Sequence, residues 1–377
     1  MKFFITLHLS FLQRRTAGEE TEGANQIMET GMKKSGAILT LILLLFGLTG
    51  LKAENVPFVY ATLVTVDPDE AHVQSAYGHA FLRMQCPSEK LDYCFSLETQ
   101  GWAQPLNILT GNYEVRLLAK PTAEYISQFD NDSCHRQLHH YPLNLTTDEL
   151  KHLWKDLDDT MMEQTLPYHD FVKNGCSQGI MNIVMRNING TLTFDEPKIE
   201  RYGTTTLGLA LKNLQQPSYV ETVLPLLSNH NAVFGRLEPS QRLFIPTCLP
   251  QILASATIND ANGTTRPLIK PGTRVESIAT RSSFPWTYTW QVVLAAALYT
   301  LYIIIERKRK IPRKVAKPLG IILATAYTLL FLLMVWVTST TRVSVFSGWT
   351  WSYLWINPIW VFVAWKFISP GKGKKGL

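Results

Sequence analysis

Three long uncharged stretches near the C-terminus constrain this 377-residue chain more than any other feature. They cover 286–305, 319–338 and 343–365, and no Asp, Glu, Lys or Arg interrupts any of them. A helix rises about 1.5 Å per residue, so about 20 apolar residues cross the roughly 30 Å hydrocarbon core of a bilayer. The pattern predicts transmembrane helices at 286–305, 319–338 and 346–367, which excludes a purely soluble protein.

The N-terminal region has the composition of a secretory signal. Two lysines precede an apolar core at 37–48, and Ala53 ends the segment. This order is typical of a signal peptide. We therefore expect residues 32–53 to be a signal peptide and residues 1–31 to be an upstream extension, with an uncleaved signal anchor as the alternative. In either case the chain from Glu54 onward leaves the cytoplasm.

Positive charge is concentrated on one side of the predicted spans. Lysines and arginines crowd 306–318 and follow the third span, whereas only Arg342 lies between the second and third. Loops rich in Lys and Arg stay in the cytoplasm. The C-terminus is therefore predicted to be cytoplasmic, and the segment 54–283 to lie outside.

The segment 54–283 is large enough to bury a core of its own. Alternating apolar residues predict three strands, at 58–66, 77–83 and 91–97. An apolar stripe at helical spacing predicts a helix at 146–164, which Thr146 and Glu149 open with a capping box. A second helix is predicted to begin near Cys176. Separate strands and helices indicate an α+β domain followed by an α-helical transmembrane region.

Charge and motif content exclude several classes of function. The net charge of +6 comes from 36 Lys and Arg against 30 Asp and Glu, and much of the excess flanks the predicted spans. We therefore expect no nucleic-acid partner. The chain has no C-x-x-C or H-E-x-x-H spacing and no phosphate-binding glycine loop, so we expect no metal and no cofactor.

All five cysteines fall in the predicted exported domain. An oxidising compartment favours disulfides, and an odd number leaves one thiol over. Cys86 and Cys94 flank a predicted strand turn, and we expect them to form a disulfide. Cys134 and Cys248 are a second candidate pair. We expect Cys176 to be free.

Cys176 has the position of a reactive thiol. It follows Asn174 and Gly175 and opens a predicted helix, where backbone amides and the helix dipole favour the thiolate. A thiolate becomes a nucleophile when an imidazole lies within hydrogen-bond reach. His79 is the candidate base, because it lies in a compact predicted strand between a glycine and an alanine. Taken alone, the two residues fit a buried cysteine and a core histidine better than a catalytic pair.

A second nucleophile motif overlaps the first. Residues 175–179 read Gly-Cys-Ser-Gln-Gly and match the G-x-S-x-G elbow of serine hydrolases, with Ser177 as the nucleophile. That fold requires a buried strand before the elbow, whereas 168–173 is half polar. The sequence therefore favours the cysteine.

Three segments resemble the exported domain of the Bacteroides-type lipoprotein N-acyltransferase family. They run from Ser75 to Arg83, from Cys86 to Ser96 and from Tyr168 to Ser177. That domain is similar to permuted papain-like, NlpC-type cysteine enzymes, in which the histidine precedes the cysteine. Members of the family carry more C-terminal spans than the three predicted here.

The resemblance implies roles for individual residues. Cys176 would be the nucleophile and His79 its base. A third polar group would orient the imidazole, with Glu98 favoured over Ser96. Support for the oxyanion is assigned to Tyr77, Asn174 and Gly175.

The resemblance also implies an activity. It predicts a membrane-anchored acyltransferase, in which an acyl chain passes as a thioester from a membrane lipid to the terminal amine of a diacylglyceryl-modified lipoprotein. The donor is either a membrane phospholipid or the lipoprotein's own glyceride. The resemblance places the enzyme in the bacterial inner membrane with its main domain in the periplasm. A membrane-tethered papain-like cell-wall peptidase or amidase and a catalytically inactive exported binding domain are the alternatives.

Overall fold

The structure is a computed structural model of the chain. It describes residues 59–69, 75–99, 105–131, 134–163, 170–215, 220–280, 313–354 and 356–360. The predicted upstream extension at 1–31, the signal peptide at 32–53 and the first predicted span at 286–305 lie outside these residues. The chain divides into two units, Met1–Val56 and Pro57–Leu377, and every described residue belongs to the second.

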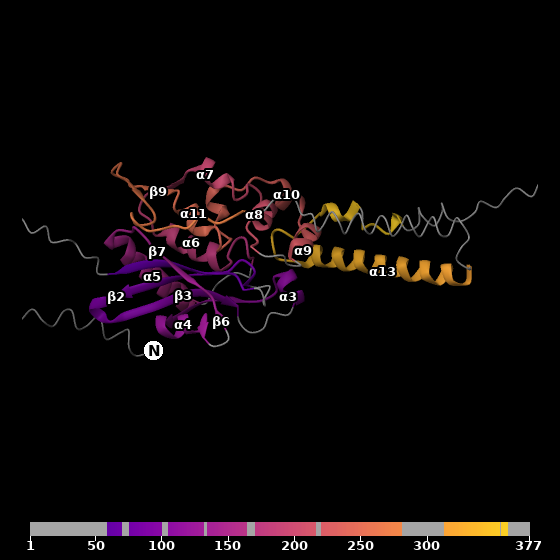
Figure 1. The fold of residues 1–377 in the computed structure, drawn as a ribbon, viewed down its shortest axis with the longest axis horizontal. Helices are drawn as coiled ribbons and strands as arrows, with labels where there is room; N and C mark the ends of the chain where they lie inside the picture. The colour runs from indigo at the N-terminus through magenta and orange to yellow at the C-terminus, as the bar shows by residue number, and fades with distance from the viewer. Residues whose placement is uncertain are drawn as a thin grey trace, which may run out of the picture. The chain divides into compact units, whose positions relative to one another are not determined.

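A five-stranded antiparallel sheet forms the centre of the second unit (Figure 1). Its strand order is β4-β3-β2-β1-β7. The strands are β1 (Tyr60–Val66), β2 (His79–Cys86), β3 (Leu91–Thr99), β4 (Val115–Pro121) and β7 (Leu138–Pro142). The three strands predicted from alternation are confirmed as β1, β2 and β3.

Two smaller sheets accompany the central one. They comprise β8 (Thr191–Phe194), β9 (Ala256–Asn259) and β10 (Thr265–Pro267) in one, and β5 (Asp130–Asn131) with β6 (Cys134–His135) in the other. The helices are α3 (Pro105–Thr110), α4 (Thr122–Ser127), α5 (Thr147–Glu163), α6 (Cys176–Arg186), α7 (Glu196–Glu200), α8 (Thr206–Lys212), α9 (Val220–Leu227), α10 (His230–Phe234), α11 (Leu249–Leu253) and α13 (Arg313–Thr340). The 3-10 helices among the described residues are η2 (Pro87–Glu89), η3 (Pro239–Arg242) and η4 (Trp351–Leu354).

The two faces of the central sheet bury different cores, because successive strand residues point to opposite sides. On one face, Ala80 and Leu82 of β2 join the large core, and α5 and α6 pack against it. On the other face, Phe81 joins a smaller cluster with Tyr125 of α4 and Phe129. The candidate functional residues described below lie around the N-terminal end of β2, and elements on both faces of the sheet contribute to them.

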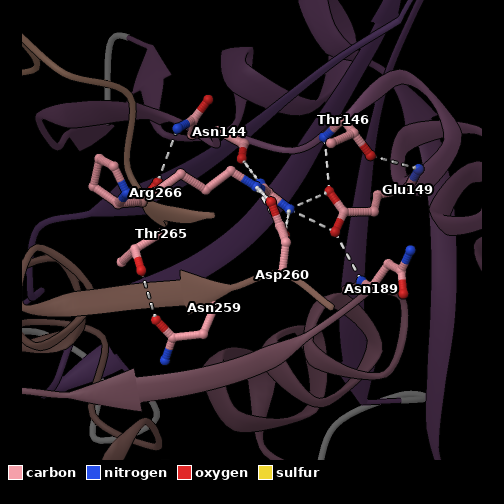
Figure 2. Close-up of polar contacts among 9 residues, drawn as sticks. Asn144, Thr146, Glu149, Asn189, Asn259, Asp260, Thr265 and Arg266 are labelled. Carbon is pink, nitrogen blue, oxygen red and sulfur yellow. Dashed lines mark hydrogen bonds and ion pairs between the residues drawn. The ribbon is translucent and has the colours of Figure 1, made fainter. Parts of the chain in front are cut away.

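A buried ion pair fixes the start of α5 (Figure 2). The capping box predicted from the sequence is confirmed: the Thr146 amide donates to Glu149, and the Glu149 amide donates to the Thr146 hydroxyl. The Glu149 carboxylate is only 2% exposed and also accepts from Nη2 of Arg266 at 2.6 and 2.7 Å and from the Asn189 amide at 2.7 Å. Arg266 in turn lies 3.2 Å from Asp260. One glutamate therefore joins α5, the turn before β8 and the β9–β10 hairpin.

The predicted α-helical transmembrane region is wrong. Within the described ranges, no helix combines the length and the apolar character that crossing a membrane requires. The predicted span at 319–338 falls within α13, and the one at 346–367 begins in turns and the single-turn η4. Val343 and Phe346 are almost fully buried in the large core. The start of that uncharged run is therefore buried inside the protein, whereas Trp349, Leu354, Ile359 and Trp360 further along it are exposed.

The predicted Cys86–Cys94 disulfide is also wrong, because all five cysteines are free. In the register of β2 and β3, Cys86 pairs with Leu91 and Cys94 pairs with Arg83. Cys86 lies in the large core and Cys94 in the smaller cluster, on the opposite face of the sheet. A disulfide requires side chains that point toward each other, and this register excludes it. The second candidate pair, Cys134 with Cys248, is excluded in the same way by two free thiols.

Candidate functional site

Two glycines determine how Cys176 is presented. Cys176 is the first residue of α6, and Gly175 is its N-cap. A Cβ on Gly175 would lie 2.6 Å from the carbonyl oxygen of Phe171, closer than real contacts allow. One turn later, a Cβ on Gly179 would lie 2.2 Å from Cδ1 of Leu97. The first glycine therefore lets the preceding loop close tightly against the nucleophile, and the second lets α6 approach β3.

The loop before Cys176 is held by a buried carboxylate. Asp170 accepts from the amides of Val172 at 3.0 Å and Lys173 at 3.4 Å. Its own amide donates to Oδ1 of Asn174 at 2.6 Å. Asn174 therefore braces the loop, and its side-chain oxygen is used within it.

A distant segment completes this support. The Ser344 amide donates to Oδ2 of Asp170 at 2.9 Å, and the Phe346 ring lies 5.8 Å from that of Phe171. The hydroxyl of Thr341 donates to the Leu109 carbonyl at the end of α3. The segment after α13 therefore ties the nucleophile loop to the rest of the unit.

His79 is the first residue of β2, and its imidazole is held from one side. Its Nε2 lies 3.0 Å from Oγ of Ser96 on β3 and 3.0 Å from the hydroxyl of Tyr125 on α4. The rings of Phe81 and Phe129 lie 6.2 and 5.9 Å away. With Nε2 engaged, Nδ1 is the ring nitrogen left to exchange a proton with a substrate or a sulfur.

Glu98 influences this arrangement through Tyr125. Burial and then the Glu98 carboxylate raise the pKa of Tyr125, so its hydroxyl keeps its proton. A hydroxyl that donates toward Glu98 can accept the Nε2–H of His79, which leaves Nδ1 as the basic nitrogen. Glu98 also lies 3.8 Å from Nζ of Lys120. The imidazole contacts Ser96 and Tyr125 directly, whereas the Glu98 carboxylate acts on it through Tyr125.

The pairing between β2 and β3 ends near the two candidate catalytic residues. The strands β2 and β3 pair from Cys86–Leu91 to Leu82–Phe95, whereas β2 begins at His79. The amide of Ala80 forms a hydrogen bond with the sulfur of Cys176, which favours the thiolate. No hydrogen bond joins His79 to Cys176 among the residues that the structure describes. The fold brings the sulfur to the residue next to His79.

Burial sets the protonation states of both groups. It raises the pKa of the Cys176 thiol, opposed by the amides of Ala80, Ser177 and Cys176 itself. It also lowers the pKa of His79 to about 4, with a smaller contribution from the positive charge of Arg136. At neutral pH the pair is therefore a thiol and a neutral imidazole, the form in which the imidazole can accept a proton.

Tyr77 and Ser177 lie in the interior. The Tyr77 hydroxyl is buried and finds no hydrogen-bond partner in the described part of the chain, and burial together with Glu221 raises its pKa, so it stays protonated. Ser177 is 0% exposed within α6. A substrate has no access to that hydroxyl, which disfavours the serine-elbow interpretation.

Sequence reasoning missed Tyr125 and Arg136. Tyr125 reaches the imidazole because α4 packs on the sheet face that carries Phe81, and Arg136 lies over the Phe129 ring at 5.5 Å. Neither residue belongs to a local motif, so no signal in the sequence pointed to them. Within the described part of the chain, no cluster of three His, Cys, Asp or Glu could hold a metal ion.

Comparison with known proteins gives one match. Residues 58–210 match the family model described as the Lnb N-terminal periplasmic domain. The match covers both His79 and Cys176, and it confirms the resemblance to the Bacteroides-type lipoprotein N-acyltransferase family over this segment. No curated protein and no solved structure matches the chain.

Proposed function

Because residues 58–210 of this chain match the family model of the Lnb N-terminal periplasmic domain, we propose that it is a cysteine acyltransferase that N-acylates the terminal cysteine of bacterial lipoproteins. The observation that carries this proposal is the free sulfur of Cys176 at the start of α6, facing the amide next to His79. A free, amide-stabilised sulfur beside a neutral imidazole is the arrangement that nucleophilic acyl transfer needs.

The first half-reaction forms a thioester. The proton of the Cys176 thiol passes to Nδ1 of His79, and the thiolate attacks the ester carbonyl of a lipid donor. The negative charge that develops on the carbonyl oxygen is stabilised by backbone amides at the start of α6. When the C–O bond of the ester breaks, the leaving alkoxide takes the proton from the imidazolium, so the lipid departs as an alcohol.

The second half-reaction releases the acyl chain to an amine. The α-amine of a diacylglyceryl-modified N-terminal cysteine attacks the thioester, and His79 accepts the proton that the amine loses. The C–S bond then breaks, the thiolate regains a proton, and the product is an amide. The side chain of Cys176 is largely enclosed, which limits hydrolysis of the thioester by water.

Donor and acceptor define where the enzyme works. The lipid donor and the lipoprotein acceptor are both anchored in the cytoplasmic membrane, with their reactive groups at its outer surface. We place the domain at the periplasmic face of that membrane, where its partners are membrane phospholipids and lipoproteins. Holding both reactants at one surface favours their encounter with the sulfur.

Intact-mass spectrometry tests the proposal. The purified full chain is mixed with phospholipid vesicles and a synthetic diacylated lipopeptide with a free terminal cysteine. We expect one acyl adduct on Cys176 and one amide-linked acyl chain on the lipopeptide, and neither with Cys176→Ala. Cys134→Ala is the matched control, since Cys134 is another free, partly buried thiol.

Other outcomes would identify the alternatives. Release of peptides from added cell-wall fragments, without acyl transfer, would identify a papain-like peptidase or amidase. An absence of any adduct on Cys176 with lipid and wall substrates alike would leave a binding domain.

A further inference from the structure

A groove with a volume of about 630 Å³ opens on the β7 side of the candidate site. Its lining includes Asp130, His135, Arg136, Leu138, His139 and Glu276. The candidate chemistry does not use any of these residues directly. The groove therefore requires an explanation of its own.

Arg136 is incompletely satisfied inside this groove. Its Nε donates to the Asp67 carbonyl at 2.7 Å, and its guanidinium lies over the Phe129 ring. Its Nη2 is buried and has no hydrogen-bond partner among the residues that the structure describes. Buried polar groups in native proteins are nearly always paired, so an unpaired guanidinium nitrogen indicates a partner from outside the chain.

Three acidic residues near Arg136 each contact another basic side chain. Asp130 lies 3.2 Å from His135, and Glu276 lies 3.5 Å from Arg274. The Asp67 carboxylate lies 3.0 Å from Nε2 of His139, and the Asp67 backbone carbonyl accepts from Nε of Arg136.

No ion pair neutralises Arg136 within the described part of the chain. Burial lowers the pKa of Arg136, and the charge of Asp69 is the largest of the influences that oppose this. The positive charge is therefore available to an anion that enters the groove.

The groove is coupled to the catalytic histidine in two ways. Phe129 lies between them, with its ring 5.9 Å from that of His79 and 5.5 Å from the Arg136 guanidinium. In the sheet, His79 pairs with Val66, and Val66 pairs with Leu138. Adjacent strands are about 4.8 Å apart, so Leu138 in the groove lies roughly 10 Å from His79.

Resting on the proposed function, we infer that Arg136 binds the phosphodiester of the acyl donor, and that this donor is a glycerophospholipid. The planar guanidinium matches phosphate oxygens in a bidentate arrangement. In a glycerophospholipid, the phosphate is joined to the ester carbonyls by the short glycerol backbone. An anchored phosphate therefore delivers an ester toward the sulfur of Cys176. The diacylglyceryl group of a lipoprotein has no phosphate, so Arg136 does not contribute to its binding.

A binding experiment tests the subsite without any turnover. Alkylation of Cys176 by iodoacetamide is followed in the full chain while glycerophosphoglycerol, which has the phosphodiester but no acyl chains, is titrated in. We expect saturable protection in the wild type, and protection at least about tenfold weaker in Arg136→Gln, because the charge-assisted hydrogen bonds are lost. Arg136→Lys keeps the positive charge but lacks the planar guanidinium that binds phosphate in a bidentate arrangement, so its protection should be intermediate. Arg116→Gln is the matched control, since Arg116 already pairs with Glu114.

A donor comparison tests the consequence for catalysis. Thioester formation on Cys176 is measured with phosphatidylglycerol and with a phosphate-free diacylglycerol in the same detergent micelles. In the wild type we expect a KM at least about tenfold lower for the phospholipid, and in Arg136→Gln we expect this ratio to fall toward one.

The outcomes separate the inference from the proposed function. Equal protection of the wild type and Arg136→Gln, or equal KM values for the two donors in the wild type, would overturn the phosphate subsite while leaving the acyltransferase intact. Failure to form a thioester with either donor would overturn the acyltransferase, and the protection experiment would still report on the groove.

Discussion

Nε2 of His79 lies 3.0 Å from the hydroxyl oxygen of Ser96, on the neighbouring strand of the central sheet. The same nitrogen lies 3.0 Å from the hydroxyl of Tyr125, which comes from a helix on the sheet face. Two hydroxyls on two elements therefore fix one edge of the imidazole. The opposite edge carries Nδ1, the nitrogen that the proposed chemistry requires.

Removing these hydroxyls should slow acylation of Cys176. Each of Ser96→Ala and Tyr125→Phe removes one neutral hydrogen bond, and we expect the acylation rate to fall roughly five- to tenfold in each. Single-turnover thioester formation measures this rate. Ser127→Ala, which changes an exposed serine on α4, is the control and should be unchanged. A wild-type rate in both hydroxyl variants would show that the imidazole is positioned by other means.

The pH dependence should reflect the low pKa of His79, which burial lowers to about 4. The base is active when unprotonated, so the rate of thioester formation should be lost as pH falls through about 4, well below the usual histidine range. NMR titration of the His79 ring gives the same pKa independently. A titration near 6.5 would contradict the enclosed environment of the ring.

The same pKa predicts a change in stability. Between about pH 6.5 and pH 4 the unfolded chain binds a proton at His79 that the folded chain does not, so stability falls as pH decreases through this window. Urea unfolding at pH 5 and pH 7 measures the difference, and His79→Gln should reduce it. An identical difference in His79→Gln would assign the effect to other groups.

The contact between Asp170 and Ser344 should control the nucleophile loop. Ser344→Pro removes the amide that donates to Asp170, and we expect alkylation of Cys176 to change in rate and the melting temperature to fall. Ser344→Ala keeps the amide and is the matched control. Thermal unfolding and iodoacetamide kinetics provide the two measurements. Equal behaviour of the two variants would show that the loop does not depend on this bond.

The pair between Glu149 and Arg266 should matter for stability alone. Glu149→Ala leaves a nearly buried arginine without this partner and should lower the free energy of unfolding by about 3–5 kcal/mol. Asp148→Ala changes the neighbouring carboxylate, which is 86% exposed, and should stay within about 0.5 kcal/mol of the wild type. Urea denaturation measures both. A small loss in Glu149→Ala would mean that Asp260 alone suffices for Arg266.

Local patterns in the sequence predicted several features of the fold. Alternation predicted β1, β2 and β3, and the spacing of Thr146 and Glu149 predicted the start of α5. The Asn-Gly-Cys segment and the apolar spacing after it predicted a helix start at Cys176, which the structure confirms. These features depend on residues a few positions apart, whose chemistry acts within one strand or one turn.

The wrong predictions concern where such segments are placed. The Cys86–Cys94 disulfide followed from their closeness in sequence, but the register of β2 and β3 puts them on opposite faces. The transmembrane region followed from apolar runs, yet Val343 and Phe346 lie inside the protein core. An uncharged stretch shows that a segment lacks charge, and does not show which of its residues are buried or what covers them.

From the sequence, the family resemblance identified Cys176 and His79 as the candidate nucleophile and base, whereas a cysteine at a helix start and a histidine in a strand, taken alone, also fit ordinary buried residues. Only the tertiary structure decided what surrounds them: the hydroxyl of Tyr125 on the imidazole, the amide of Ala80 on the sulfur and the unpaired guanidinium of Arg136 in the neighbouring groove. These contacts join residues that are far apart in the chain. They form because the apolar residues on both faces of the sheet are buried, which brings α4 and α6 against it. The free energy gained by this burial comes from the whole fold and not from any local segment.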